Sequence, residues 1–178
     1  MARRPIAIID NTLLSCLGKV GIHDRLPMVF DRVLIPPAVN AEHGAGPGKA
    51  RQRLRNLKKE LPDFFVSCND RDPFQLLVLN EKLDAGEAEV LAQADFWRTQ
   101  QAQQQVYALI DERKGRAFGR RLDIKVWRTG RLLVEMKNRA LISQVQPYLD
   151  NLRSRTTFWL DDSAYRAVLR LAGELSRF

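Results

Sequence analysis

The sequence predicts an α/β protein of three layers, α/β/α, in which helices cover both faces of a central, mainly parallel sheet. Short apolar runs alternate with helical stretches for most of the length, and no internal repeat or long flexible linker interrupts the alternation. The chain has 178 residues, of which 45% are hydrophobic, enough for one packed core. We therefore expect a single domain over residues 1–178, with a helical C-terminal part, 130–178, packed on it.

Short apolar runs are expected to form the strands of this sheet. The first run, Ile6–Ile9, lies between Pro5 and Asp10, and the run 106–110 stops at Asp111. In chain order the runs are 6–9, 33–35, 64–66, 106–110 and 124–127. Apolar runs of this length, bounded by charged or turn-forming residues, are typical of buried strands.

Helices are expected between these runs, where apolar residues recur every three or four positions. After the first strand, Leu13 and Leu17 show this spacing, and Gly18 or Gly21 could end the helix. Pro36 and Pro37 suit the first turn of a second helix. The other expected helices are a cationic one with Leu54, Leu57 and Leu61 on one side, 73–83, one that begins at Asp84, a basic one after Asp111, stretches around 132–141 and 145–152, and 163–175.

Positive charge is in excess and is concentrated in two segments. The chain carries 29 Lys and Arg against 21 Asp and Glu, a formal net charge of +8. The segment 49–59 has six cations and no acid before Glu60, and 113–131 has eight cations against Asp123 alone. Such clusters attract polyanions, of which nucleic acid is the commonest in a cell. The alternative, that both are solvated helix faces, stays open at this point.

Several classes of protein are excluded by composition. Two cysteines cannot form a disulfide framework, and a cysteine zinc site would need more ligands. His23 and His43 lie far apart without the spacing of a zinc peptidase, and we expect both on the surface. No apolar run is long enough to span a bilayer or serve as a signal peptide. We expect a cytoplasmic protein with no membrane partner.

Two acids are expected at the same edge of the sheet. Asp10 and Asp111 each follow directly on a predicted strand. Open parallel sheets bind ligands in the crevice beyond the carboxyl ends of their strands. Either acid alone could be a helix N-cap, but two at equivalent places favour a shared acidic crevice.

Glu42 and Glu87 are further candidates. Glu42 lies about six residues past the second predicted strand. Glu87 lies three residues after Asp84, a spacing that a capping box would also explain. At about 100° per residue, Glu89 lies roughly 200° around the helix from Glu87, so the two cannot face one site.

Four gathered carboxylates would repel one another unless cations lay among them. Mg²⁺ and Mn²⁺ prefer oxygen ligands and keep several waters, which suits sparse carboxylates. Such an ion lowers the pKa of a bound water and clamps a phosphodiester for attack. The acidic crevice and the basic segments therefore fit one activity, in which cations hold the phosphates of the strand that is cut.

At these residues the chain resembles the PIN-domain nucleases, and in particular the VapC-type branch with a Gly-Glu-Ala third motif. The resemblance extends to Ala172–Glu174 and so covers nearly the whole chain. The segments that resemble the four acidic motifs are 8–12, 30–42, 83–89 and 109–116. Each motif is short, but four in the right order are fairly specific.

The resemblance implies a Mg²⁺- or Mn²⁺-dependent ribonuclease, often the toxin of a bacterial toxin–antitoxin pair. By position, the metal would be held by Asp10, Glu42, Glu87 and Asp111. Thr12 would orient Asp10 through its hydroxyl, and Arg113 and Arg116 would contact the RNA phosphates. Glu112 stands where relatives commonly show a second Asp.

The partners expected on this basis are RNA, a cognate antitoxin and a second copy of the chain. Two alternatives remain: a nucleic-acid-binding module of the same fold without cleavage, and an interaction protein whose cations bind an acidic partner. The glutamine-rich segment 97–105 is longer than the usual turn of the family before the next strand, and its role is open.

Overall fold

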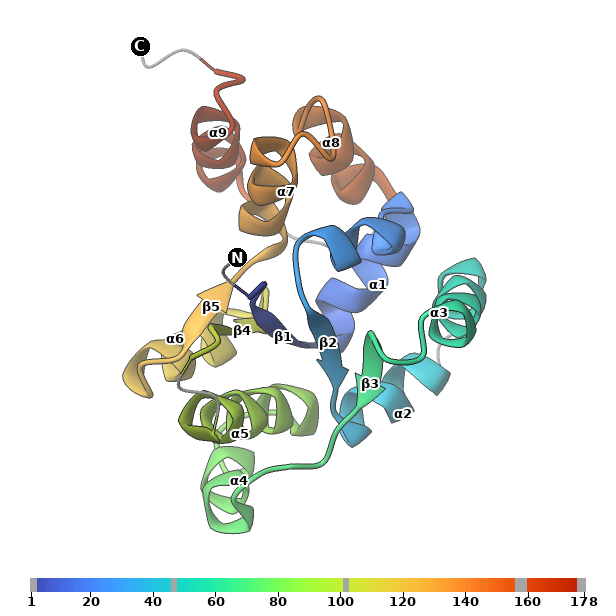
Figure 1. Cartoon of the computed structure of the whole chain (residues 1–178). Helices are drawn as coiled ribbons and strands as arrows, with labels where there is room; N and C mark the ends of the chain where they lie inside the picture. Colours follow the sequence, from blue (N-terminus) through green and yellow to red (C-terminus); the bar gives the residue numbers. More distant parts are fainter. Residues whose placement is uncertain (1–2, 46–47, 101–102, 156–159, 176–178) are drawn as a thin grey trace.

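The structure is a computed structural model that describes residues 3–45, 48–100, 103–155 and 160–175. Within these ranges, five parallel strands form one sheet in the order β3-β2-β1-β4-β5 (Figure 1). The strands are β1 (Ile6–Ile9), β2 (Arg32–Ile35), β3 (Phe65–Ser67), β4 (Val106–Leu109) and β5 (Lys125–Trp127). With helices on both faces, this sheet confirms the predicted three-layer α/β/α class.

Helices connect the strands and continue after β5. They are α1 (Asn11–Val20), α2 (Pro37–Ala45), α3 (Lys49–Glu60), α4 (Pro73–Asn80), α5 (Ala85–Gln100), α6 (Arg113–Arg121), α7 (Thr129–Asn138), α8 (Gln146–Arg155) and α9 (Asp162–Leu171), with a 3₁₀ helix, η1 (His23–Met28), after α1. Helix α5 packs on β1 and β4, and α6 packs on β5, whereas α1 lies on the other face and contacts α3, α7 and α8 (Figure 1). No helix in the described ranges is both long and apolar enough to cross a membrane.

The central strand β1 is buried on both faces. Its four side chains, Ile6 to Ile9, are at most 1% exposed, as expected for a strand covered by helices on each side. The chain runs outward from β1 through β2 to β3 and then crosses back to β4 on the other side of β1. The strand order therefore reverses between β1 and β4, where open α/β sheets form their ligand crevice.

Register places the two predicted strand-end acids at this reversal point. Ile9 of β1 pairs with Leu109 of β4. Asp10 is the next residue after Ile9, and Asp111 is the second after Leu109. Both acids therefore leave the sheet at its carboxyl edge, one residue apart in register.

One of the two predicted ends of the first helix is confirmed, and two other predicted helix ends are shifted. Gly21, not Gly18, ends α1, since it adopts a left-handed conformation with φ of 77°. The final helix ends at Leu171 instead of 175, because Gly173, with φ of 68°, turns the chain. Helix α4 ends at Asn80 instead of 83.

The prediction that His23 and His43 lie on the surface is wrong. Both side chains are buried against α1. The Nε2 of His23 lies 2.7 Å from the carbonyl oxygen of Leu14, and the Nδ1 of His43 lies 3.2 Å from Oδ1 of Asn11. Burial lowers the pKa of His23 to about 4, so its ring is neutral at pH 7. These imidazoles pack η1 and α2 against α1.

Candidate active site

Asp10 is a buried carboxylate that also caps a helix. It precedes α1 in an extended conformation, and its Oδ1 accepts a hydrogen bond of 2.7 Å from the N–H of Leu13. Burial raises the pKa of Asp10 well above its ordinary value, and the carboxylates of Asp111 and Glu87 raise it further. The capping role explains the position of Asp10, but it does not explain two further acids beside it.

Asp111 lies across the reversal point from Asp10 and is held by the start of α7. Its Oδ1 accepts a hydrogen bond of 2.9 Å from the N–H of Thr129, and its Oδ2 accepts one from the hydroxyl of the same residue. Burial raises the pKa of Asp111, while the bonds from Thr129 and the charges of Arg128 and Arg116 lower it. Asp111 is therefore fixed by its neighbours, although it is costly to ionise.

Glu87 belongs to the first turn of α5 and points toward α6. Its N–H donates to Oδ1 of Asp84 at 2.8 Å, which is half of the expected capping box. Its Oε1 instead accepts a hydrogen bond of 3.1 Å from the N–H of Gly115. A Cβ at residue 115 would lie 2.6 Å from this oxygen, so the contact depends on glycine. Burial and the charge of Asp84 raise the pKa of Glu87.

Glu42 lies beside this group on α2 and is more exposed. Partial burial raises its pKa, as do the charges of Asp84 and Glu89, while a hydrogen bond from Asn11 lowers it. A Cβ at Gly86 would lie 3.3 Å from Oε1 of Glu42, which places this carboxylate against the start of α5.

Glu89 faces away from Glu87, as the helical spacing predicts. Its Oε2 accepts a hydrogen bond of 2.7 Å from the N–H of Ala38, and its Oε1 lies 3.4 Å from a guanidinium nitrogen of Arg71. Glu89 therefore joins α5 to the start of α2.

The structure brings three of the four predicted acids into electrostatic contact. Asp10 interacts directly with Asp111 and Glu87, whereas Glu42 is linked to the group through Asn11 and the first turn of α5. Among the described residues, no three His, Cys, Asp or Glu side chains form a group that could hold a metal ion by themselves. Mg²⁺ needs only one or two carboxylates when waters complete its shell. The donors present, above all the mutually repelling Asp10 and Asp111, therefore fit such an ion.

Cations surround Asp111 on the solvent side. The Nε of Arg116 donates to the backbone oxygen of Asp111 at 3.2 Å. Burial lowers the pKa of Arg116, and the neighbouring charges of Arg128 and Arg120 lower it further. Arg113 is exposed in the first turn of α6. Crowded cations of this kind favour an anion such as phosphate between them.

Thr12 is half-buried in the first turn of α1. In the part of the chain that the structure describes, it makes no hydrogen bond to Asp10, which is oriented by Leu13 instead. The sequence alone assigned no role to Thr129 or Gly115, which hold Asp111 and Glu87. The position of Thr129 could have identified it as a candidate, because it lies two residues after β5, just as Asp111 lies two residues after β4.

Comparison with known proteins agrees with this geometry. No curated protein matches the chain, but the model of a family described as a PIN domain matches residues 6–174. The match covers the whole sheet, all four predicted acids and the helices α1 to α9. The chain therefore belongs to the PIN-domain family.

Proposed function

We propose that the protein is a metal-dependent endoribonuclease that hydrolyses RNA phosphodiester bonds with Mg²⁺ or Mn²⁺. PIN domains are generally nucleases, and this chain keeps acids where the strand order reverses. The observation that carries the proposal is the buried Asp10 at the end of β1, whose pKa is raised by burial and further by the carboxylates of Asp111 and Glu87. Carboxylates that repel one another in this way are stabilised by a divalent cation.

Asp10 and Asp111 would hold the ion, and Glu42 and Glu87 would hold it directly or through waters. When bound, the ion supplies Lewis acidity and a water of lowered pKa. Leu13 and Thr129 keep the first two carboxylates in place through their N–H groups. Gly115 does the same for Glu87.

The cations around Asp111 would bind the substrate. We assign phosphate contacts to Arg113 and Arg116 at the start of α6, and a substrate contact to Thr12 at the start of α1. The net charge of +8 favours a polyanion over an uncharged substrate.

Cleavage of labelled single-stranded RNA tests this function. We expect cleavage with Mg²⁺ or Mn²⁺, none with a chelator, and a loss of at least a hundredfold in Asp10→Asn. Asp70→Asn, a change at an exposed acid outside the site, is the matched control and should cleave at the wild-type rate. Equal metal-dependent rates in Asp10→Asn and wild type would refute the assignment of the site.

A second function is favoured by two observations. Because no three of the described acids converge on a metal position, the same fold could bind RNA without cleaving it. Glu112, in place of a second Asp, points the same way. Salt-sensitive RNA binding without cleavage in either metal would establish the binding module.

We further propose that the protein acts in the cytoplasm as the VapC-type toxin of a type II toxin–antitoxin pair, and as a homodimer. A gene for a small acidic protein beside its own would support a cognate antitoxin. Growth arrest on induction of wild type but not of Asp10→Asn would support the toxin role. If both arrest growth equally, the chain acts instead as an interaction protein that binds an acidic partner.

A further inference from the structure

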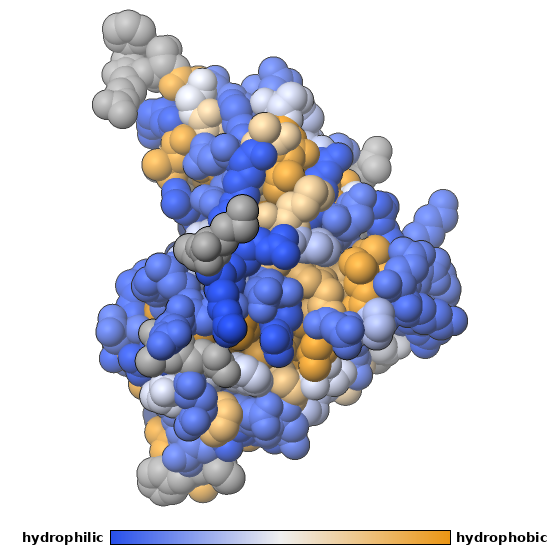
Figure 2. Space-filling model, viewed as in Figure 1, coloured by the Kyte–Doolittle hydropathy of each residue, from blue (hydrophilic) through white to orange (hydrophobic). Residues whose placement is uncertain are grey.

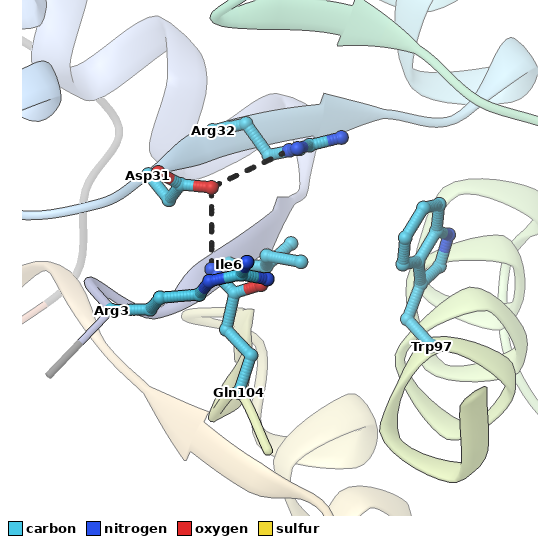
Figure 3. Close-up of a pocket in the computed structure, with 6 residues that line it drawn as sticks. All are labelled: Arg3, Ile6, Asp31, Arg32, Trp97 and Gln104. Atoms are coloured by element: carbon cyan, nitrogen blue, oxygen red, sulfur yellow. Dashed lines mark hydrogen bonds and ion pairs between the residues drawn. The ribbon is translucent and has the colours of Figure 1, made fainter. Parts of the chain in front are cut away.

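Two adjoining cavities lie at the amino edge of the sheet, opposite the acidic group. The first has a volume of about 360 Å³ and is lined by Arg3, Ile6, Asp31, Arg32, Trp97 and Gln104 (Figure 3). The second, of about 460 Å³, shares Gln104 and extends past Val106 to Lys125. We call the two together the amino-edge groove. Both volumes lie within the range of about 300–1,000 Å³ that is typical of ligand sites.

Hydrogen bonds hold the polar side of the groove in place. The Nε2 of Gln104 donates to the backbone oxygen of Arg4 at 2.6 Å and lies 3.3 Å from Oδ2 of Asp31. The same Oδ2 lies 3.7 Å from the Nε of Arg32. Figure 3 shows this cluster on one side of the cavity, with Trp97 rising from α5 on the opposite side.

The groove carries an excess of positive charge. Among the described residues, Arg3 and Lys125 have no ion-pair partner, whereas Arg98 is paired with Asp95 at 2.6 Å. Figure 2 shows strongly hydrophilic side chains gathered over this region, where the chain starts and β1 begins. The unpaired cations favour an anionic ligand that lies along the edge.

The groove also offers an aromatic ring and groups that bind a base. Trp97 lines the first cavity and is half-buried, with one part of its indole packed against the core and its Nε1 buried. Bases of single strands stack on such rings, while amides and carboxylates bind their edges. A duplex hides the faces of its bases, and so cannot use this ring.

Helix α6 joins the groove to the acidic group. It begins two residues after Asp111 and ends four residues before Lys125. Arg113, Arg116 and Arg120 recur at a spacing of three and four residues, which places them along one side of the helix. A helix of this length spans about 13 Å at 1.5 Å per residue, so α6 carries these cations from the acidic edge of the sheet toward the amino edge.

We propose that the amino-edge groove is a second binding site for single-stranded RNA. One part of the strand lies at the acidic group, the strand then follows α6, and the groove binds a nucleotide farther along it. Trp97 stacks on the base, Gln104 contacts its edge, and Arg3 and Arg32 bind the phosphate. This inference rests on the proposed function only in that the strand is the substrate. It also gives a role in substrate binding to the described part of the glutamine-rich segment, 97–100 and 103–105; residues 101–102 lie outside the described ranges.

Fluorescence anisotropy with a labelled 20-residue oligouridylate tests the groove, in chelator so that no cleavage occurs. Arg32→Ala should weaken binding three- to tenfold and reduce the slope of log affinity against log salt by about 0.7. Trp97→Ala should weaken binding about tenfold, and Trp97→Phe should restore most of the loss because the ring is kept. Arg166→Ala, at an exposed cation on α9, is the matched control and should leave both quantities unchanged.

The groove proposal is overturned if Arg32→Ala keeps the wild-type salt slope, or if Trp97→Phe binds as weakly as Trp97→Ala. Should Trp97→Ala not fold, Arg32→Ala and Gln104→Ala decide the matter alone. The outcome is separable from that of the nuclease proposal. If Asp10→Asn loses cleavage but Arg32→Ala binds RNA as tightly as wild type, only the groove proposal is refuted. If Arg32→Ala binds RNA more weakly but the wild type cleaves RNA with neither metal, only the groove proposal is supported.

Discussion

Replacing Thr129 by Val removes one hydrogen-bond donor from Asp111 while keeping the shape of the side chain. The N–H of residue 129 still donates to Oδ1, but Oδ2 loses the hydroxyl. A hydrogen bond to a charged group contributes about 1.5–3 kcal/mol. We therefore expect the free energy of unfolding at pH 7 to fall by about that amount. The pKa of Asp111 should rise further, because the ionised carboxylate loses more from the missing hydroxyl than the protonated carboxyl does.

The loss of stability in Thr129→Val should depend on pH, because the hydroxyl of Thr129 binds the protonated form of Asp111 less strongly than the ionised form. As the pH falls through its pKa, the carboxyl loses its charge, and the hydroxyl of Thr129 then contributes only about 1 kcal/mol. The difference in the free energy of unfolding between Thr129→Val and wild type should therefore be smaller at low pH. Urea unfolding in chelator at pH 7 and pH 4 measures both values.

Two controls make this experiment decisive. Thr129→Ser keeps the hydroxyl and should behave like wild type, and in an Asp111→Asn background the Val substitution should cost less than 1 kcal/mol. Cleavage by Thr129→Val should fall tenfold or more, because a misplaced Asp111 no longer orients its ligands. A Thr129→Val protein with wild-type stability at pH 7 would refute the role given to this hydroxyl.

Three further predictions concern other buried groups. Asp10→Asn should raise the free energy of unfolding by roughly 0.5–2 kcal/mol in chelator. Asn also caps helices, and the change removes a buried carboxylate whose pKa is raised. Urea unfolding measures the difference, and a lower stability of the variant would contradict the prediction. Gly115→Ala should slow cleavage at least tenfold and lower the melting temperature, because its Cβ would displace the carboxylate of Glu87 and lie 3.0 Å from Cγ2 of the buried Ile110; a wild-type rate would count against a role for Glu87. The pKa of His23 is about 4 in the folded chain and 6.5 in the unfolded one, so wild type should lose about 3 kcal/mol relative to His23→Gln as pH falls from 6.5 to 4. If the stability of both proteins changes with pH in the same way, folding does not lower the pKa of His23.

Much of the sheet and the positions of two candidate acids, Asp10 and Asp111, could be predicted from local sequence. The run Ile6–Ile9 is uncharged and bounded by Pro5 and Asp10, so strand and acid were both visible. Parallel pairing then places Asp111 at the same edge, because equivalent ends of parallel strands meet.

Contacts between distant segments could not be predicted in the same way. Thr129 reaches Asp111 only through the register of β4 and β5, and Gly115 reaches Glu87 only because α6 packs on α5. The burial of His23 likewise depends on how η1 folds back on α1, where the carbonyl oxygen of Leu14 satisfies its ring. Periodicity reports the buried side of one helix, but not which partner covers it.

The central claim is that the acids at the β1–β4 reversal point bind a divalent ion. A crystal structure of the protein soaked with Mn²⁺ tests it most directly. We expect an anomalous peak within about 2.0–2.3 Å of carboxylate oxygens from Asp10 and Asp111, absent from crystals of Asp10→Asn. A wild-type crystal with Mn²⁺ bound elsewhere, and water alone between these two side chains, would contradict the claim.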